Sequence, residues 1–280
     1  MTGSPRPASR RRRGIWSAGR RSPGIAIDLG SARTRAWMPG QGLVIDVPTT
    51  TSTGAQGICF PVRRGQVVDL PGAVRLLDHL LGRRAGFGNC SIVVLTTPVL
   101  CVDEHRVSAL AALEVLDART LLTIDSVKAG AIGAGADLKQ PLLVVDIGAH
   151  LTEVGLLVDG AVTKPSRLAL GTSDLGAATT AAALVDWIVT AVTGLLRDDD
   201  LGPQVVDALE RGPLLTGGGA LRPEITYRLA RRLRVAVRSA PAPHLAAVRG
   251  AGLALIAADR HPSFANEVPT GHTTSPNADS

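Results

Sequence analysis

Leu142-Leu-Val-Val-Asp-Ile-Gly-Ala-His-Leu-Thr-Glu-Val-Gly-Leu-Leu-Val158 is the stretch of sequence that decides the fold. Its first apolar run brings Asp146 to the end of a strand, a short turn containing Gly148 follows, and a second apolar strand returns over 154–158. This pattern predicts a β-hairpin with a carboxylate and a glycine at its bend. Such a bend suits a metal-bound phosphate, because glycine lets backbone N–H groups approach phosphate oxygens while the aspartate holds Mg²⁺ directly or through water.

The same device occurs near the N-terminus, in Gly24-Ile-Ala-Ile-Asp-Leu-Gly-Ser-Ala-Arg-Thr-Arg-Ala-Trp37. Here Asp28 and Gly30 occupy the positions that Asp146 and Gly148 have in the later hairpin. Two copies of one motif predict a duplicated fold with a nucleotide bound between its halves.

The composition describes a globular chain with one basic tail. The 280 residues suffice for one large domain or two small ones, and with 2% aromatic residues the core must consist of Val, Leu, Ile and Ala. The net charge is +6, but residues 1–22 contain seven arginines and no acidic residue, so the remainder is close to neutral. This distribution argues against a broad nucleic-acid-binding face and favours a local electrostatic contact.

Cysteine usage and hydropathy indicate a cytoplasmic protein. Cys59, Cys90 and Cys101 have no metal-type spacing and are expected to be reduced thiols. Ile15-Trp16 is too short for the apolar region of a signal peptide, and no stretch reaches the roughly 18 apolar residues of a membrane span. The tails 1–22 and 260–280 are expected to be disordered. The first tail, with Trp16, either contacts an anionic membrane surface at the inner face or is a solvated extension.

Strands alternate with helices along the chain and predict a mixed α/β sheet with helices on its faces. The expected strands are 25–28, 34–38, 43–47, 92–95, 121–124, the hairpin 142–158, 162–170, 213–216 and 233–237. The expected helices are about 72–83, 103–116, 126–135, 175–197, one opening at 202, 223–232 and 245–259.

Three motifs together resemble those of the actin, Hsp70 and sugar-kinase superfamily. Asp28-Leu29-Gly30 is similar to its phosphate-1 motif, Asp146-Ile147-Gly148 with Thr152-Glu153 to its phosphate-2 motif, and Leu215-Thr216-Gly217-Gly218-Gly219 to its adenosine motif. Within the superfamily the chain most resembles the bacterial actins of the MreB/Mbl family, because residues 40–48 are similar to their third strand and residues 241–254 to their C-terminal helix. The likeness covers about residues 24–258.

The resemblance implies an α/β fold of the actin-like (ribonuclease H-like) type, duplicated into two lobes, IA and IIA, with mixed sheets flanked by helices. Lobe IA would span 23–135 with a vestigial subdomain IB at about 49–64. Lobe IIA would span 136–244 without subdomain IIB, and the helix 245–259 would return to lobe IA. The chain would thus be a shortened form that lacks most of both outer subdomains.

The resemblance also implies that Mg²⁺-ATP lies between the lobes, with Asp28 and Asp146 on either side of the hydrated metal ion. Backbone at 31–33 and 149–151 would cradle the phosphates, and the triple glycine would lie against the adenosine. The implied nucleotide-binding residues are Asp28, Gly30, Ser31, Ala32, Arg33, Asp146, Gly148, Ala149, His150, Leu151, Thr152, Gly217, Gly218, Gly219, Ala220 and Leu221.

Two departures from the family pattern bear on this chemistry. Ala149 and His150 stand where the phosphate-2 turn usually has glycine, and a Cβ at a position with positive φ or next to a phosphate costs about 1 kcal/mol or more. Ser126 stands where the family has a glutamate that orients the attacking water, and the adjacent Asp125 would point about 100° away on a helix. We therefore expect weakened ATP binding, at most a weak ATPase activity and no assignable catalytic residue, since positioning of water is worth orders of magnitude in rate.

Two functions follow from the resemblance. The first is an MreB/Mbl-like cytoskeletal protein of cell shape or cell-wall organisation, which forms membrane-associated filaments alone or with a full-length MreB-like homologue and works with cell-wall synthesis or shape-complex proteins. The alternative is a nucleotide-dead adaptor or scaffold that does not polymerise. A sugar kinase would need a catalytic aspartate base, and a chaperone would need a peptide-binding domain; neither is evident in the sequence.

Overall fold

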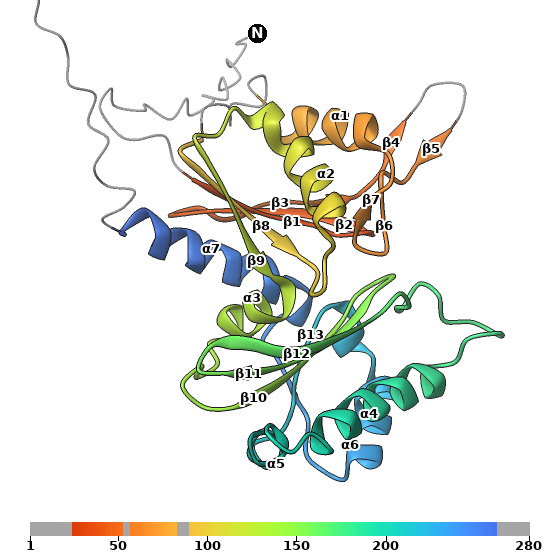
Figure 1. The fold of residues 1–280 in the computed structure, drawn as a ribbon. Coiled ribbons are helices and arrows are strands. Elements are labelled where there is room, and N and C mark those ends of the chain that lie inside the picture. Colours follow the sequence, from red (N-terminus) through yellow and green to blue (C-terminus); the bar gives the residue numbers. More distant parts are fainter. Residues whose placement is uncertain (1–23, 53–56, 83–89, 262–280) are drawn as a thin grey trace, which may run out of the picture.

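The computed structural model describes residues 24–52, 57–82 and 90–261 and contains two five-stranded sheets (Figure 1). The first sheet has the order β3-β2-β1-β8-β9, formed by β1 (Ile25–Leu29), β2 (Arg33–Met38), β3 (Gly42–Pro48), β8 (Ile92–Thr97) and β9 (Thr120–Asp125). The second has the order β12-β11-β10-β13-β14, formed by β10 (Leu142–Ile147), β11 (Thr152–Val158), β12 (Ala161–Leu168), β13 (Leu214–Thr216) and β14 (Arg238–Ser239).

The two sheets repeat one topology. In the first, β1 pairs antiparallel with β2 and parallel with β8, and in the second β10 pairs antiparallel with β11 and parallel with β13. The residues at the hairpin bends correspond as well, because Leu29 faces Thr34 in the first and Ile147 faces Thr152 in the second. The predicted duplication and the mixed α/β architecture are confirmed.

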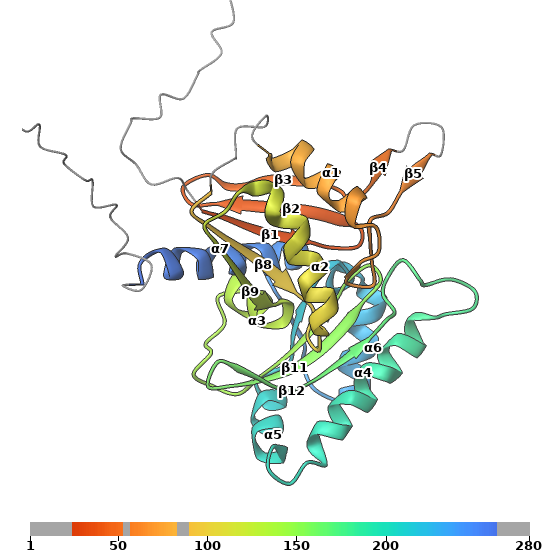
Figure 2. The same cartoon turned by 45° about the horizontal axis from the view of Figure 1, so that its top comes forward.

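The helices and sheets stack in layers (Figures 1 and 2). Two helices cover the outer face of the first sheet, α1 (Leu70–Leu81) and α2 (Asp103–Leu113). Three cover the outer face of the second sheet, α4 (Ala181–Leu196), α5 (Gly202–Glu210) and α6 (Pro223–Leu233). Between the two sheets lie α3 (Ser126–Gly133) and α7 (Ala246–Asp259). The 3₁₀ turn η5 (Pro243–Leu245) contacts the start of α7, and the 3₁₀ turn η4 (Gly218–Leu221) contacts η5 and α6.

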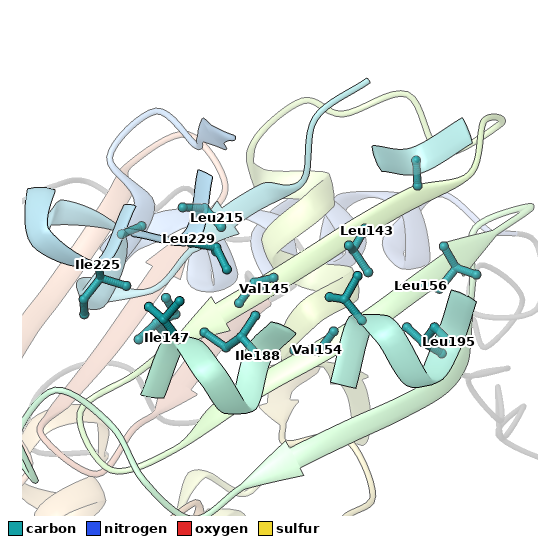
Figure 3. Packing of buried hydrophobic residues seen from close by; sticks show 14 of the residues in the cluster. Leu143, Val145, Ile147, Val154, Leu156, Ile188, Leu195, Leu215, Ile225 and Leu229 are labelled. Atoms are coloured by element: carbon teal, nitrogen blue, oxygen red, sulfur yellow. The ribbon is translucent and has the colours of Figure 1, made fainter. Parts of the chain in front are cut away.

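Aliphatic side chains build the core on both faces of β10. Leu143, Val145 and Ile147 face α4 and α6 (Figure 3), whereas Leu142 and Val144 face α3. Because side chains alternate across a strand, a strand that is covered on both faces is apolar at every position. This is why residues 142–145 form an unbroken apolar run.

The helices α3 and α7 cross at two glycines. A Cβ on Gly250 would lie 1.8 Å from the carbonyl oxygen of Ala129, and a Cβ on Gly133 would lie 1.9 Å from that of Ala246. The two backbones therefore touch, which agrees with the close packing that the Ala/Gly-rich helix 126–135 permits. On its other side α7 packs against β1 and β8 of the first sheet through Ala251 and Leu255, so that this helix joins the two halves.

The sequence predicts reduced outer subdomains in two connections of the chain. The described residues between β3 and α1 form only two-residue strands, β4 (Thr51–Ser52), β5 (Ile58–Cys59), β6 (Val62–Arg63) and β7 (Gln66–Val67). Between β12 and β13 the chain forms α4 and α5. No helix in the described residues is long and apolar enough to cross a membrane.

Two expected elements are shifted. The helix expected at 175–197 begins at Ala181, because Thr180 caps it by accepting a hydrogen bond from the Ala183 N–H at 3.2 Å. The strand expected at 233–237 is replaced by the end of α6 at Leu233 and a left-handed Arg234 (φ 59°), and the strand itself follows at Arg238–Ser239. Apart from Arg260 and His261, the predicted disordered tails lie outside the described residues.

Candidate functional site

A cleft of about 320 Å³ opens between the two halves, a size typical of small-molecule sites. The β1–β2 turn and the β10–β11 turn line it from opposite sides. Its remaining walls come from the start of α3, the β13–η4 turn, η5 and residues 172–173. The duplicated hairpins therefore share one cavity, as the sequence predicts.

The two turns that face the cleft are closed in the same way. The Gly30 N–H donates to the Arg33 carbonyl oxygen at 3.1 Å, and the Gly148 N–H donates to that of Leu151 at 2.8 Å. A Cβ on Gly30 or Gly148 would lie 2.9 or 3.0 Å from the accepting carbonyl oxygen. Both glycines are thus needed for the tight bend.

Each half also carries an aspartate held by a threonine of the neighbouring parallel strand. The Thr96 hydroxyl donates to Asp28 Oδ1 at 2.8 Å, and the Thr216 hydroxyl donates to Asp146 Oδ1 at 2.8 Å. Neither threonine is among the site residues expected from the sequence. The signal that could have found them is the shared position at the ends of parallel strands, which meet at one edge of a sheet.

The residues opposite these aspartates differ in charge. Arg35 faces Asp28 across the β1–β2 ladder, and Glu153 faces Asp146 across the β10–β11 ladder. Arg35 Nη1 lies 3.5 Å from Asp28 Oδ2, and its Nε lies 3.2 Å from Asp46 Oδ1. The first half of the site therefore contains a fixed cation where the second contains an acid.

Burial raises the pKa values of two acids in the second half. It raises the pKa of Asp146 to about 6, aided by the negative charge of Asp28 and opposed by the Thr216 hydroxyl and by Arg35. Burial and the charge of Asp146 also raise the pKa of Glu153 well above its usual value, although Glu153 Oε1 accepts a hydrogen bond from the Val99 N–H at 2.5 Å. Both acids thus favour their protonated forms more than exposed carboxylates do.

Most residues expected at the nucleotide line this cleft. They are Asp28, Gly30, Ser31, Ala32, Arg33, Asp146, Gly148, Ala149, His150, Leu151, Gly217 and Gly218, together with Ser126.

Five expected residues do not line the cleft. Thr152 is buried and donates its hydroxyl to the Leu170 carbonyl oxygen at 2.8 Å. Gly219 packs on Ile147, Ala220 is buried in the core, and Leu221 is 57% exposed, because the 3₁₀ turn η4 sends successive residues in different directions. Asp125 is likewise absent from the lining; burial raises its pKa, and Arg106 and Lys128 oppose the rise.

The structure adds residues from distant segments to the lining. Among them is His244, whose Nδ1 is buried and forms no hydrogen bond within the described residues. An unsatisfied buried nitrogen beside an open cleft is suited to a polar ligand atom. The other additions are Leu29, Arg35, Gly65, Thr96, Pro98, Glu153, Thr172, Ser173, Pro243 and Ala247.

The altered phosphate-2 turn is not strained. Neither Ala149 nor His150 is among the positive-φ residues of the described chain. Ala149 packs on Gly171, where a Cβ would lie 2.5 Å from the Ala149 carbonyl. The part of the expected penalty that depends on a left-handed backbone therefore does not arise, and the part that depends on proximity to a phosphate stays a prediction.

The fit of Mg²⁺ differs between the two aspartates. Both oxygens of Asp28 already face protein donors, Thr96 and Arg35, whereas Asp146 uses only one oxygen, for Thr216. Within the described residues no group of three or more His, Cys, Asp or Glu side chains could hold a metal ion. Of the two aspartates, Asp146 is thus the one that offers an oxygen suited to a hydrated Mg²⁺, which often takes one or two carboxylates.

Ser126 is the first residue of α3, and its hydroxyl donates to the Thr97 carbonyl oxygen at 3.0 Å. Its proton is therefore committed to the backbone. The geometry supports the expectation that this position does not activate water.

Two lobes of one topology, with matched Asp-x-Gly turns on opposite sides of a cleft, form an actin-like fold. The family model described as "MreB/Mbl protein" matches residues 50–179. The cell shape-determining protein MreB of Escherichia coli (strain K12) is 24% identical over 178 residues, which covers 52% of this chain and 51% of that protein. MreB of Salmonella typhimurium gives the same values, so the match spans about half the length of these curated relatives.

Solved structures agree with this fold. MreB5 of Spiroplasma citri bound to AMPPNP is similar with a TM-score of 0.70 at 18% identity, covering 82% of this chain and 95% of that one. A MamK double helical filament is similar with a TM-score of 0.69 at 17% identity, covering 86% and 99%. The family model, the curated relatives and the solved structures agree that the chain has an actin-like fold and is similar to bacterial proteins of the MreB family.

Proposed function

We propose that the chain is an MreB/Mbl-like cytoskeletal protein that binds ATP in the cleft between its lobes and assembles into filaments, alone or with a full-length MreB-like homologue. The observation that carries the proposal is the pair of matched Asp-x-Gly turns facing one cleft of about 320 Å³. The solved relatives support it, since MreB5 was crystallised with AMPPNP and with ADP and MamK was solved as a double helical filament.

The lining divides into a phosphate side and a base side. Backbone at 31–33 and 149–151 would hold the phosphates, with the guanidinium groups of Arg33 and Arg35 adding positive charge. Gly217 and Gly218 would lie against the adenosine, and the unsatisfied Nδ1 of His244 would face a polar atom of the nucleoside. Bound Mg²⁺ would supply charge neutralisation at the phosphates, with Asp146 as its carboxylate.

A nucleotide-independent adaptor is the second candidate. The Asp28–Arg35 ion pair and the committed hydroxyl of Ser126 favour it, because both remove groups that a nucleotide hydrolase would use. The two candidates differ in two measurable properties, the affinity for ATP and the ability to polymerise.

Calorimetric titration of the full chain with ATP separates them. We expect binding, and we expect Asp146→Ala to weaken it in the presence of Mg²⁺, because that change removes the carboxylate that would hold the metal ion in the cleft. Asp207→Ala is the matched control, since Asp207 is an exposed aspartate of α5. No heat of binding at millimolar ATP would select the adaptor.

The proposed location is the cytoplasm, at the inner face of the membrane, with cell-wall synthesis or shape-complex proteins as partners. The arginine-rich segment 1–22 would provide electrostatic contact with anionic lipid. Cosedimentation with anionic vesicles, comparing the full chain with a chain lacking 1–22, tests this contact; equal binding by both would contradict it.

A further inference from the structure

Arg35 is a charged residue that the cleft holds in place. Its side chain is 13% exposed, and it lines the cleft directly opposite Asp28 on the adjacent strand. Because strand β2 presents alternate residues to one face, Arg33 and Arg35 lie on the same side of the sheet. Asp46 of β3 contacts both guanidinium groups, at 2.5 Å from Arg33 Nε and 3.2 Å from Arg35 Nε.

Both carboxylate oxygens of Asp28 have a partner. Its Oδ1 accepts the Thr96 hydroxyl proton at 2.8 Å, and its Oδ2 lies 3.5 Å from Arg35 Nη1. The equivalent aspartate of the other half, Asp146, has the threonine but faces Glu153 instead of an arginine. The two halves of the site therefore differ at one position, which is a cationic arginine in the first half and an acidic glutamate in the second.

Two acids hold the guanidinium group of Arg35 at the cleft. Its Nε is buried and lies 3.2 Å from Asp46 Oδ1, and its Nη1 lies 3.5 Å from Asp28 Oδ2. Its positive charge also lowers the pKa of Asp146, which lines the cleft from the other half. A guanidinium group binds phosphate oxygens through fixed, directional hydrogen bonds.

We propose that Arg35 supplies, as a fixed guanidinium, the positive charge between Asp28 and the nucleotide phosphates that a divalent cation would otherwise supply, so that the cleft binds nucleoside di- and triphosphates without requiring Mg²⁺. This inference rests on the proposed nucleotide binding. It assigns Asp28 to holding Arg35 rather than to a metal ion.

The first measurement is the dissociation constant for ADP and for ATP, by calorimetry on the full chain, in excess EDTA and in Mg²⁺. We expect the two conditions to differ by less than about threefold. Loss of affinity of about 30-fold or more in EDTA would overturn the inference. Binding only with Mg²⁺ would leave the proposed function intact, whereas no binding in either condition would remove both.

The second measurement uses Arg35→Leu, which keeps the aliphatic stem and removes the charge. We expect it to weaken binding at least about tenfold in EDTA and clearly less in Mg²⁺, since the metal ion then replaces the lost charge. The affinity of Arg35→Lys should lie between those of wild type and Arg35→Leu, because lysine keeps the positive charge and loses the paired N–H donors of the guanidinium group. An equal loss in both conditions, or no loss, would contradict the proposal.

Arg75→Leu is the matched control, since Arg75 is a half-exposed arginine on α1 that lies 4.0 Å from Asp69 and outside the cleft lining. Circular dichroism would establish that each variant is folded.

A third variant, Asp28→Asn, keeps an acceptor for the Thr96 hydroxyl and releases Arg35 from its partner. We expect it to tighten binding in EDTA about threefold; a loss confined to Mg²⁺ would identify Asp28 as a metal ligand and overturn the inference.

Discussion

Asp28 and Asp146 end equivalent strands, yet their neighbours give them different roles. Arg35 and Thr96 engage both oxygens of Asp28, while Asp146 is half-buried beside Glu153 with one oxygen bonded to Thr216. Because a charge in a low-dielectric site is expensive without a partner, the second half of the cleft favours an incoming cationic group or a proton. This difference could not come from the shared Asp-x-Gly motif, which both halves contain.

The raised pKa of Asp146 predicts a dependence of stability on pH. Its folded-state pKa of about 6 lies above the unfolded value of about 3.9, so the folded state binds the proton more tightly. The stabilisation is present below about pH 4 and is lost as the pH rises through about 6. We expect Asp146→Asn to be more stable than the ligand-free wild type at pH 7.5 by about 1–2 kcal/mol, because a neutral side chain keeps the Thr216 bond without the buried charge.

Urea denaturation of both proteins at pH 5 and pH 7.5 tests this prediction. Glu153 titrates in the same direction in both proteins, so the informative quantity is the difference between them. A variant that is equally stable or less stable than wild type at pH 7.5 would contradict the assignment.

At the scale of elements, the crossing of α3 and α7 holds the two halves together. The contact has no room for side chains at Gly133 and Gly250, because the opposing atoms are backbone carbonyls and amides. Backbone in a helix cannot move aside as a flexible side chain can. A methyl group at this point must therefore separate the helices.

We expect Gly250→Ala to destabilise the protein by about 3 kcal/mol, at the upper end of overpacking changes, since its Cβ would lie 1.8 Å from the Ala129 carbonyl oxygen. The control is Gly194→Ala in α4, where nothing lies within 4 Å of the added Cβ. That change should stabilise by about 0.5–1 kcal/mol, because alanine favours helix. Denaturant unfolding measures both; equal effects of the two substitutions would show that the crossing is not tight.

The β6–β7 hairpin closes one side of the cleft. Arg64 at its bend bonds the Ala169 carbonyl oxygen and lies 3.2 Å from Asp174 Oδ1 in the other half. The neighbouring Gly65 N–H donates to the Ser31 hydroxyl at 3.3 Å. The hairpin thus links the halves beside the predicted phosphate turns.

We expect Arg64→Ala to speed nucleotide release about three- to tenfold with little change in stability, because half-exposed ion pairs contribute little to folding. Stopped-flow release of a fluorescent nucleotide measures the rate. Asp174→Ala should have a smaller effect of the same sign, and the double variant should not exceed the single Arg64 change. Fully additive effects would show that the pair does not act as one unit.

At the scale of the whole molecule, the layers leave an elongated body with two unequal ends. The first lobe is covered by α1 and α2 and the second by α4, α5 and α6 (Figure 2). A contact between unlike ends is heterologous, and repetition of such a contact gives a filament where its rotation does not close a ring. Filament growth is therefore compatible with this shape.

We expect sedimentation and electron microscopy to detect filaments with ATP, either from the chain alone or with a full-length MreB-like homologue. If the connections between β3 and α1 and between β12 and β13 are reduced outer subdomains, as we predict from the sequence, they offer less contact area, so that assembly alone should need a higher protein concentration than co-assembly. A chain that stays monomeric at high concentration, also with the homologue and ATP, would contradict the filament proposal and favour the adaptor.

Interactions between residues close together in the sequence determined much of the fold of this protein. Unbroken apolar runs, Gly30 and Gly148 at the bends, and the alternation of helices and strands are set by backbone sterics and side-chain periodicity, which act over a few residues. They predicted a duplicated mixed α/β fold with a nucleotide between its halves, and the resemblance of the motifs implied the actin-like type and the residues of the phosphate turns. Gly219, Ala220 and Leu221, which the resemblance placed at the nucleotide, lie outside the cleft lining in the 3₁₀ turn η4.

Only the tertiary structure decided the charge and closure of the cleft. Thr96, Arg35 and His244 reach it from separate elements, and their contacts exist because α3 and α7 hold the two sheets face to face. The pKa of Asp146 likewise depends on burial and on Asp28, which belongs to the other half. Electrostatic interactions act through space between residues far apart in the chain, so the sequence alone could not show that Asp28 meets an arginine and Asp146 meets an acid.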